Sequence, residues 1–227
     1  LVGFKRLGLA GLQTGFFWED RMFTGIVQGL IEVGEIEHMD DISRLRLNLA
    51  ELGEGLSLGA SVAINGTCLT VVATSSKNAS FDIIKETINT TNLKYLQKGS
   101  KVNVERSFRI GDEVGGHMVS GHISSVAKLE EQVNSGNERV LTFSVSEEWS
   151  KYILHKGYVA LDGASITVSG VEPKQHKFSV SLIPETIART TLGSISKGEF
   201  VNLEIDSQTQ AIVETVERVM AERYANR

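Results

Sequence analysis

The sequence predicts an all-β fold of two tandem, homologous domains followed by one C-terminal α-helix. Three observations lead to this prediction. Short runs of β-forming residues, bounded by Gly, Asn, Asp or Ser, recur about every 8–12 residues, which is typical of a sandwich or barrel. The second half of the chain repeats the first, and only the last segment has the period of a helix.

Residues 1–21 precede the first element that we expect. This segment does not begin with Met, and its short apolar run after Lys5 and Arg6 lacks the small-residue cleavage site of a secretory signal. We therefore expect an extension over 1–21, upstream of a natural start at Met22, and exclude it from the fold.

The expected strands share runs of β-branched or aromatic residues between turn residues. They are Gly25–Val27, Arg44–Leu47, Ser61–Ile64, Thr70–Val72, Ser80–Ile83 and Lys101–Val104 in the first half, and Val140–Val145, Tyr158–Leu161, Ile166–Val168, Lys177–Val180 and Phe200–Glu204 in the second. Two Glu-Thr-Ile segments, around Glu86 and Glu185, are each expected to form a helical turn.

The tail, residues 209–227, has the pattern of one amphipathic helix. Apolar residues recur at a spacing of three or four, and Glu214 precedes Arg218 by four residues, which supports a helix. The apolar stripe consists of Ile212, Val213, Val216, Val219, Met220 and Tyr224. It either packs on its own domain or mediates self-association, and the sequence leaves both alternatives open.

Comparison of the chain with itself reveals a duplication. The matching pairs are Thr24–Val27 with Ser120–Ile123, Asn65–Val71 with Asp162–Val168, Glu86–Ile88 with Glu185–Ile187, and Val102, Asn103 and Glu105 with Val201, Asn202 and Glu204. The glycine-rich segment Gly111–Gly116 joins the halves. We therefore expect the first domain over 22–117, the second over 118–208 and the helix over 209–227.

The halves differ at positions that carry chemistry. Ile26, Asn65, Cys68 and Lys85 of the first half correspond to His122, Asp162, Ser165 and Pro184 of the second. His122 can exchange protons near neutral pH, whereas Cys68 offers a thiol. Small polar groups at strand ends orient ligands in apolar clefts. Two purely structural modules would explain the repeat but not these differences, which predict two related pockets that treat similar ligands differently.

Composition excludes several classes of protein. The net charge of −5 and the pI near 5.6 give no general attraction toward nucleic acid or anionic lipid. No apolar run approaches the ~18 residues of a membrane span. One cysteine cannot form a disulfide framework, is typical of a reducing compartment, and predicts a cytoplasmic protein. The histidines lack the spacing of metal ligands.

Several motifs in the same order resemble the riboflavin synthase family. They are Met22–Gly29, Asn65-Gly66, Gly115–His122, Asp162-Gly163 and Pro184–Thr186, and the resemblance covers nearly all of 22–227. It implies two six-stranded Greek-key barrels and a homotrimer assembled through the C-terminal helices. It also implies a transferase of riboflavin biosynthesis that needs no metal or organic cofactor. Two molecules of 6,7-dimethyl-8-ribityllumazine exchange a four-carbon unit, giving riboflavin and 5-amino-6-ribitylaminouracil.

The resemblance also implies binding residues in each barrel. In the first they are Gly25, Ile26, Val27, Cys68, Leu69, Thr70, Asp82, Ile83, Ile84, Lys85, Glu86 and Thr87; in the second they are Gly121, His122, Ile123, Ser165, Ile166, Thr167, Ser181, Leu182, Ile183, Pro184, Glu185 and Thr186. Lys156 would reach a ligand held by a neighbouring subunit, because the productive site joins the first barrel of one subunit to the second barrel of another. Thr67 stands where some relatives carry a second Cys.

Each expected catalytic residue has a role in this reaction. We expect His122 to transfer protons, with Ser165 and Thr167 orienting the ring or relaying protons and Asp162 polarising that group. Cys68 would assist addition of a nucleophile to the acceptor molecule. We expect His117 to be a structural residue of the loop at the joint.

The main alternative is a non-catalytic member of the same superfamily, which binds lumazine or flavin as an antenna. Such a protein would lose the polar residues of one barrel. This chain keeps Ser120-Gly121-His122 and the set of Asp162, Ser165 and Thr167, so the sequence favours the enzyme.

Overall fold

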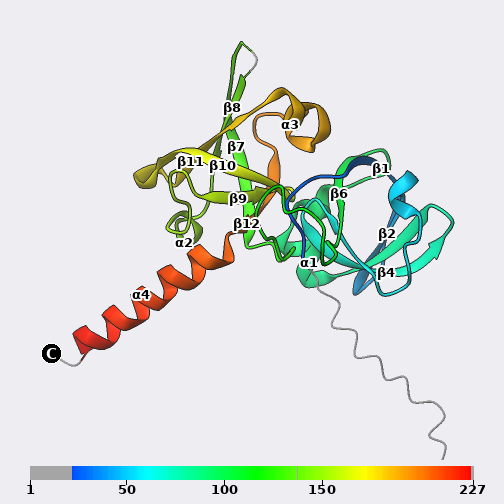
Figure 1. The fold of residues 1–227 in the computed structure, drawn as a ribbon, viewed down its shortest axis with the longest axis horizontal. Coiled ribbons are helices and arrows are strands. Elements are labelled where there is room, and N and C mark those ends of the chain that lie inside the picture. Colours follow the sequence, from blue (N-terminus) through cyan, green and yellow to red (C-terminus); the bar gives the residue numbers. More distant parts are fainter. Residues whose placement is uncertain (1–21, 137, 226–227) are drawn as a thin grey trace, which may run out of the picture.

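The computed structural model describes residues 22–136 and 138–225, which form two closed β-barrels and a long C-terminal helix (Figure 1). The first barrel consists of β1 (Gly29–His38), β2 (Ile42–Asn48), β3 (Ser61–Ile64), β4 (Thr67–Ser75), β5 (Asn78–Ile84) and β6 (Lys101–Arg106). The second consists of β7 (Ser125–Ser135), β8 (Glu138–Ser144), β9 (Tyr158–Leu161), β10 (Ala164–Glu172), β11 (Lys177–Leu182) and β12 (Phe200–Ile205). The extension over 1–21 lies outside the described residues.

Short helices connect these strands. They are η1 (Ala50–Gly53), α1 (Lys85–Thr90) and η2 (Asn92–Tyr95) in the first barrel, and α2 (Glu147–Ser150), η3 (Pro173–Gln175), α3 (Pro184–Arg189) and η4 (Thr191–Gly193) in the second. The helical turns expected around Glu86 and Glu185 are α1 and α3, and both are therefore confirmed.

The two barrels have the same antiparallel topology. The strand order is β1-β2-β5-β4-β3-β6 in the first and, in the same sense, β7-β8-β11-β10-β9-β12 in the second. The third and fourth strands of each barrel are joined by a two-residue turn, Asn65-Gly66 or Asp162-Gly163, whose φ angles are 45° and 77° or 47° and 80°. Asn-Gly and Asp-Gly favour this tight hairpin turn because both residues tolerate positive φ. The predicted duplication and the six-stranded Greek-key barrels are confirmed.

Each barrel encloses its own apolar core. Side chains alternate between the inside and the outside along a strand, and Phe81 and Ile83 of β5 are fully buried, as are Phe178 and Val180 of β11. A third group, which we call the seam cluster, consists of Phe23, Ala63, Val119 and Ala160. Within it Phe23 and Val119 form an isolated antiparallel bridge, so the segments that precede the two barrels are paired with each other.

The observed strands differ from the predicted ones in three places. Gly25–Val27 is not a strand, because the first strand begins at Gly29. The long strands β1 and β7 were not expected from the sequence. Each contains a register shift, between Val33 and Glu35 in β1 and between Leu129 and Glu131 in β7. Such a bulge interrupts the two-residue alternation by which a strand is recognised.

The C-terminal helix, α4 (Ser207–Ala225), confirms the helix expected over 209–227 as far as residue 225. Its first turn is held by Asp206, whose carboxylate accepts hydrogen bonds from the N–H and hydroxyl of Thr209 at 2.8 and 2.6 Å. Figure 1 shows the helix projecting away from the second barrel. None of the described helices is long and apolar enough to cross a membrane.

The apolar stripe of α4 is mostly uncovered. Ile212, Val216, Val219, Met220 and Tyr224 are exposed, with Tyr224 at 69%, and only Val213 packs against the second barrel. The stripe is therefore not buried on its own barrel, which was one of the two alternatives.

A polar network joins the barrels near their pseudo-twofold axis. Asn103 and Asn202 occupy equivalent positions, and each side-chain amide donates to a backbone carbonyl of the opposite barrel: Asn103 to Asp162 at 2.9 Å and Asn202 to Asn65 at 2.8 Å. Their carbonyl oxygens accept from the N–H groups of Thr191 and Asn92. These reciprocal bonds fix how one barrel lies against the other.

Candidate active site

The segments that precede the barrels cross from one barrel to the other. Gly25, which precedes the first barrel, accepts a hydrogen bond through its carbonyl from the N–H of Ser165 in the second barrel, at 2.8 Å. A Cβ on Gly25 would lie 2.6 Å from the Cβ of Ser165, and φ at Gly25 is +72°. Glycine is needed here for both the backbone conformation and the close approach.

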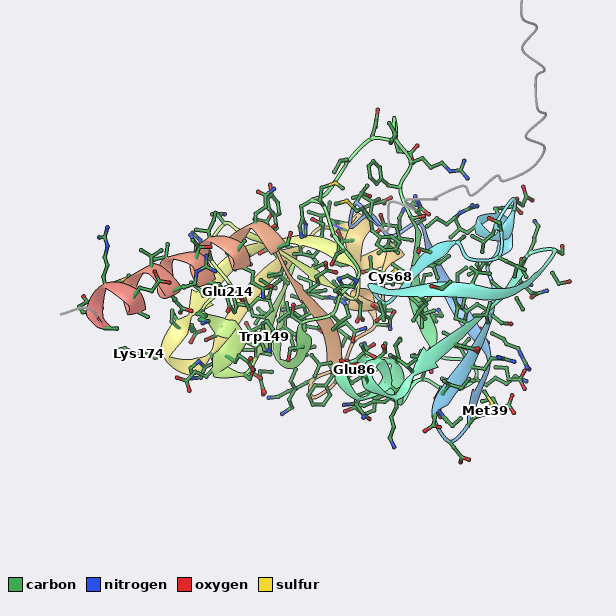
Figure 2. All side chains as sticks on the ribbon, turned by 90° about the horizontal axis from the view of Figure 1, so that it is seen from below. Met39, Cys68, Glu86, Trp149, Lys174 and Glu214 are labelled. Carbon is green, nitrogen blue, oxygen red and sulfur yellow. The ribbon has the colours of Figure 1, made fainter. Side chains whose placement is uncertain are left out.

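The reciprocal contact is made by Gly121, which precedes the second barrel. Its carbonyl accepts from the N–H of Cys68 in the first barrel at 2.9 Å, its φ is +78°, and a Cβ would lie 2.5 Å from the Cβ of Cys68. Figure 2 shows Cys68 where the two barrels meet. We call 24–27 and 120–123 the crossing segments.

A cavity of about 150 Å³ lies where the first crossing segment meets the second barrel. Its lining combines residues from both halves of the chain: Gly25, Ile26, Val27, Ala164, Ser165, Ile166, Glu185, Thr186, Arg189 and Thr190. Gly25–Val27 therefore line the pocket of the second barrel, whereas the sequence analysis assigned them to the first. In the equivalent place, Gly121, the first of the expected residues Gly121–Ile123, lies against Cys68 of the first barrel.

Ser165 is paired with His117 and not with His122. The Nδ1 atom of His117 lies 2.6 Å from the Ser165 hydroxyl, and the imidazole stacks on Tyr158 with ring centroids 5.3 Å apart. Gly116 makes this possible, since a Cβ there would lie 2.7 Å from the Cβ of Ser165. The sequence analysis treated His117 as structural. The adjacent Gly115-Gly116 was the available signal, because paired glycines allow backbone to approach another element closely.

Electrostatics favour a neutral imidazole at His117. Burial lowers the pKa of His117, and the attraction of Asp206 opposes that effect without reversing it. Burial alone would raise the pKa of Asp206, but hydrogen bonds from Thr209 and the nearby His117 give a net lowering. A neutral imidazole hydrogen-bonded to a serine can accept a proton from it or pass one on.

The equivalent surface of the first barrel, around Cys68, has different chemistry. Cys68 is half-buried and contacts the seam cluster, and it occupies the position that Ser165 has in the second barrel. His122 is exposed and directly follows Gly121, the residue that contacts Cys68 of the first barrel. The backbone N–H of His122 donates to the Ser120 hydroxyl at 3.2 Å.

Two buried glutamates anchor the crossing segments. Glu105 accepts hydrogen bonds from the N–H and hydroxyl of Thr24, and Glu204 accepts them from Ser120 and Gly121. Burial raises the pKa of Glu105 and raises that of Glu204 to about 7, and the charge of Glu105 adds to the second effect. The sequence comparison matched Glu105 with Glu204 in the Val-Asn-x-Glu repeat but assigned neither of them a role.

Asp162 belongs to the network between the barrels. Its Oδ1 accepts from the Asn92 amide at 2.9 Å and from the Asn202 N–H at 2.8 Å, and its Oδ2 accepts from the Thr191 hydroxyl at 2.9 Å. Burial outweighs these bonds and raises the pKa of Asp162 to about 7. Among the described residues its hydrogen bonds do not reach Ser165 or His122. The expected polarisation of that pair is therefore corrected to a structural role.

The remaining expected residues fall into three groups. Thr70 and Thr167 lie exposed on the same outer strand faces as Cys68 and Ser165. Others point elsewhere: Ile83 and Leu182 are buried in the barrel cores, and Asp82 makes a bidentate ion pair with Arg44 on β2 at 2.7 and 2.9 Å. Leu69 is likewise buried in the core of the first barrel. The rest, namely Ile84, Lys85, Glu86, Thr87, Lys156, Ser181, Ile183 and Pro184, lie on the two barrels, with Lys156 exposed in the loop before β9.

Comparisons with known proteins agree with this architecture. The family model for the lumazine binding domain matches twice, over 24–107 and 120–206. Riboflavin synthase of Escherichia coli (strain K12) is 48% identical over 207 residues, covering 89% of this chain and 95% of that protein. Riboflavin synthase of Chlamydia muridarum is 40% identical over 202 residues, covering 89% and 98%.

Solved structures with the same fold include two complexes of LumP. The complex with 6,7-dimethyl-8-(1'-D-ribityl) lumazine superimposes with a TM-score of 0.73 and 26% identity, covering 82% of this chain and 99% of that one. The complex with riboflavin gives a TM-score of 0.74 and 27% identity, covering 81% and 98%. With two matched domains and curated relatives at 40–48% identity over nearly all of the described barrels, the chain belongs to the riboflavin synthase family.

Proposed function

We propose that the chain converts two molecules of 6,7-dimethyl-8-ribityllumazine into riboflavin and 5-amino-6-ribitylaminouracil, with one molecule bound on each barrel. The observation that carries this proposal is the pair of equivalent sites, one with Cys68 and one with Ser165 beside His117. A reaction in which one molecule gives up a four-carbon unit and an identical molecule accepts it needs two sites of one shape and different chemistry.

The second barrel is the better candidate for proton transfer. The C7-methyl group of the lumazine is acidic because the ring delocalises the resulting carbanion, so a modest base is sufficient. The neutral His117 imidazole, connected to the Ser165 hydroxyl at 2.6 Å, supplies such a base, and Thr167 on the same strand face orients the ring. Positioned acid–base groups of this kind contribute roughly 10²–10⁴-fold.

The first barrel is the better candidate for the acceptor molecule. Cys68 is half-buried on the outer face of β4, next to the segment that carries His122. A thiolate is a stronger nucleophile than a hydroxyl and can assist addition to the acceptor ring. Holding the two molecules together would supply a further large part of the acceleration, up to about 7–11 kcal/mol.

The exposed stripe of α4 supports a homotrimer assembled through this helix. Five apolar side chains are uncovered along the stripe, and a contiguous exposed apolar surface of this kind marks an interaction site. In such a trimer the first barrel of one subunit would face the second barrel of another, and the exposed Lys156 would reach the ligand held by the neighbour. The single cysteine of the chain supports a reducing, cytoplasmic location.

A binding protein without turnover is the alternative function, and the likeness to the ligand complexes of LumP is the observation in its favour. Identity to those structures is 26–27%, against 48% to the riboflavin synthase of Escherichia coli. The polar residues of both pockets also favour the enzyme.

Incubation of the purified protein with 6,7-dimethyl-8-ribityllumazine as the sole substrate separates the two functions. The proposal predicts one riboflavin for every two lumazines consumed, followed by absorbance and chromatography. A spectral shift of bound lumazine without riboflavin would establish the binding protein instead.

A further inference from the structure

We propose that Glu105 and Glu204 are positioning residues, and that each carboxylate holds the ligand pocket of the barrel opposite to its own. The inference rests on the proposed function only in taking the surfaces around Cys68 and Ser165 as ligand pockets. It assigns a role to two buried acidic residues that the chemistry described above does not use.

Glu204 lies on β12 of the second barrel and is only 5% exposed. Its Oε1 accepts hydrogen bonds from the N–H and the hydroxyl of Ser120, both at 2.7 Å, and its Oε2 accepts from the N–H of Gly121 at 3.0 Å. The next contact along the chain reaches the first barrel, because the Gly121 carbonyl accepts from the N–H of Cys68. One residue therefore separates the Glu204 carboxylate from the wall of the Cys68 pocket.

Glu105 makes the mirror arrangement from β6 of the first barrel, where it is 4% exposed. Its Oε1 accepts from the N–H of Thr24 at 2.6 Å and from the Thr24 hydroxyl at 2.8 Å. Gly25 then accepts from the N–H of Ser165 at 2.8 Å and lines the cavity of the second barrel. Each carboxylate is thus bonded to the crossing segment that forms part of the opposite pocket.

The energetics of the two groups fit an anchoring role. Burial raises the pKa of both carboxyl groups, the charge of Glu105 raises that of Glu204 further, and the N–H and hydroxyl groups of the crossing segments oppose these effects. Hydrogen bonds to a charged acceptor are stronger than neutral ones, and a buried acceptor without its donors is costly. Each segment is therefore held in one conformation, and its adjoining glycine is pressed onto the neighbouring strand.

A purely structural role makes a different prediction from a positioning role. If the glutamates only stabilised the fold, removal of either would weaken both pockets equally. If each holds the opposite pocket, Glu204→Gln damages the Cys68 pocket and spares the Ser165 pocket, while Glu105→Gln does the reverse. Glutamine keeps the size of the side chain but replaces one acceptor oxygen by an NH₂ donor. That donor cannot accept the hydrogen bonds that the carboxylate receives from the crossing segment.

Cys68 provides a built-in probe of one pocket because it is the sole cysteine of the chain. We would measure its alkylation by iodoacetamide in the full-length protein, with and without riboflavin, for the unmodified chain and both glutamine variants. Flavin fluorescence titration would give the number of bound ligands per chain, and circular dichroism would establish folding. Glu204→Ala and Glu105→Ala serve as a second pair should either glutamine variant fail to fold.

We expect Glu204→Gln to weaken the protection of Cys68 by riboflavin about 10- to 100-fold, as for loss of hydrogen bonds to a charged group. Glu105→Gln should weaken this protection much less, because it leaves the three hydrogen bonds of Glu204 to Ser120 and Gly121 in place and removes only the charge that Glu105 exerts on Glu204. Each variant should lose one of the two ligand sites. Protection lost in Glu105→Gln but kept in Glu204→Gln, or lost equally in both, would overturn the proposal.

A measurement without ligand separates this inference from the proposed function. The crossing segment lies on Cys68 whether or not a ligand is bound, so Glu204→Gln should change the alkylation rate of the unliganded protein while Glu105→Gln should not. Absence of riboflavin binding to the unmodified chain would contradict the proposed function, which treats the surfaces around Cys68 and Ser165 as ligand pockets. An unchanged alkylation rate in Glu204→Gln would contradict the positioning role itself.

Discussion

The first and second barrels are the same backbone carrying different chemistry. Their strand orders are identical, their Asn65-Gly66 and Asp162-Gly163 turns have nearly equal φ angles, and Gly25 and Gly121 make the same contact across the seam. At equivalent positions of β4 and β10, the first barrel has Cys68 and the second has Ser165, which is hydrogen-bonded to His117. The duplication thus gives two sites of one shape, and single side chains decide what each site does to its ligand.

The largest loss of activity is expected when Ser165 or His117, which form a hydrogen-bonded pair in the second barrel, is replaced. Ser165→Ala and His117→Ala should each lower the turnover number about 10²–10⁴-fold, because they remove a positioned proton-transfer group. Steady-state riboflavin formation measures the effect. Riboflavin affinity in the same variants, which should change little, is the control. Turnover close to that of the unmodified enzyme in both variants would remove the second barrel as the proton-transfer site.

Substitutions at Gly25 and Gly121 test how much the close approach of the crossing segments to the opposite barrel contributes to the stability of the fold. Gly25→Ala and Gly121→Ala should lower the free energy of unfolding by about 2–5 kcal/mol, the sum of the cost of a left-handed conformation and of overpacking. Gly59→Ala is the matched control, because Gly59 has φ +83° and no atom within 4 Å of an added Cβ. Urea unfolding gives all three values. Equal losses at Gly25, Gly121 and Gly59 would show that close approach at the seam contributes nothing.

Asp162 is one of the positions at which the polar network differs between the barrels, since its counterpart in the first barrel is Asn65. Burial raises the pKa of Asp162 from 3.8 to about 7, so the folded chain binds more protons than the unfolded one between these values. Stability contributed in this way is present at low pH and falls as the pH rises from about 4 to 7. Asp162→Asn should remove that part of the decline, which is on the order of a few kcal/mol.

Thermal unfolding at several pH values measures the difference between Asp162→Asn and the unmodified chain. Glu204 titrates in the same direction in both proteins, so its contribution cancels. The reciprocal variant, Asn65→Asp, should add a second decline over the same range. Parallel stability curves for the unmodified chain and Asp162→Asn would show that the carboxylate is ionised throughout.

The smallest effect on activity is expected when Cys68 is replaced by serine, the residue that the second barrel has at the equivalent position. Cys68→Ser should lower riboflavin formation about tenfold, because a hydroxyl is a weaker nucleophile than a thiolate. Ligand affinity, measured by fluorescence titration, should be unaffected because serine has nearly the same size. A variant as fast as the unmodified enzyme would restrict Cys68 to packing.

The sequence predicted the repeated fold better than the composition of each pocket. Alternating strands, paired turn glycines and the terminal helix are local patterns, so they can be recognised without a structure. The positions of Gly25 and Gly121 on opposite barrels depend on contacts between residues far apart in the chain, Gly25 with Ser165 and Gly121 with Cys68. No local pattern encodes such contacts. For the same reason the contact between His117 and Ser165 was not predicted.

The division of labour between the two barrels can be tested by separating proton transfer from carbon–carbon bond formation. In D₂O, exchange of the C7-methyl protons of 6,7-dimethyl-8-ribityllumazine, followed by NMR, reports the first step, and riboflavin formation reports both. We predict that His117→Ala loses exchange and riboflavin together, whereas Cys68→Ala keeps exchange above the rate in buffer and loses riboflavin. Exchange that survives in His117→Ala and disappears in Cys68→Ala would contradict the assignment of proton transfer to the second barrel.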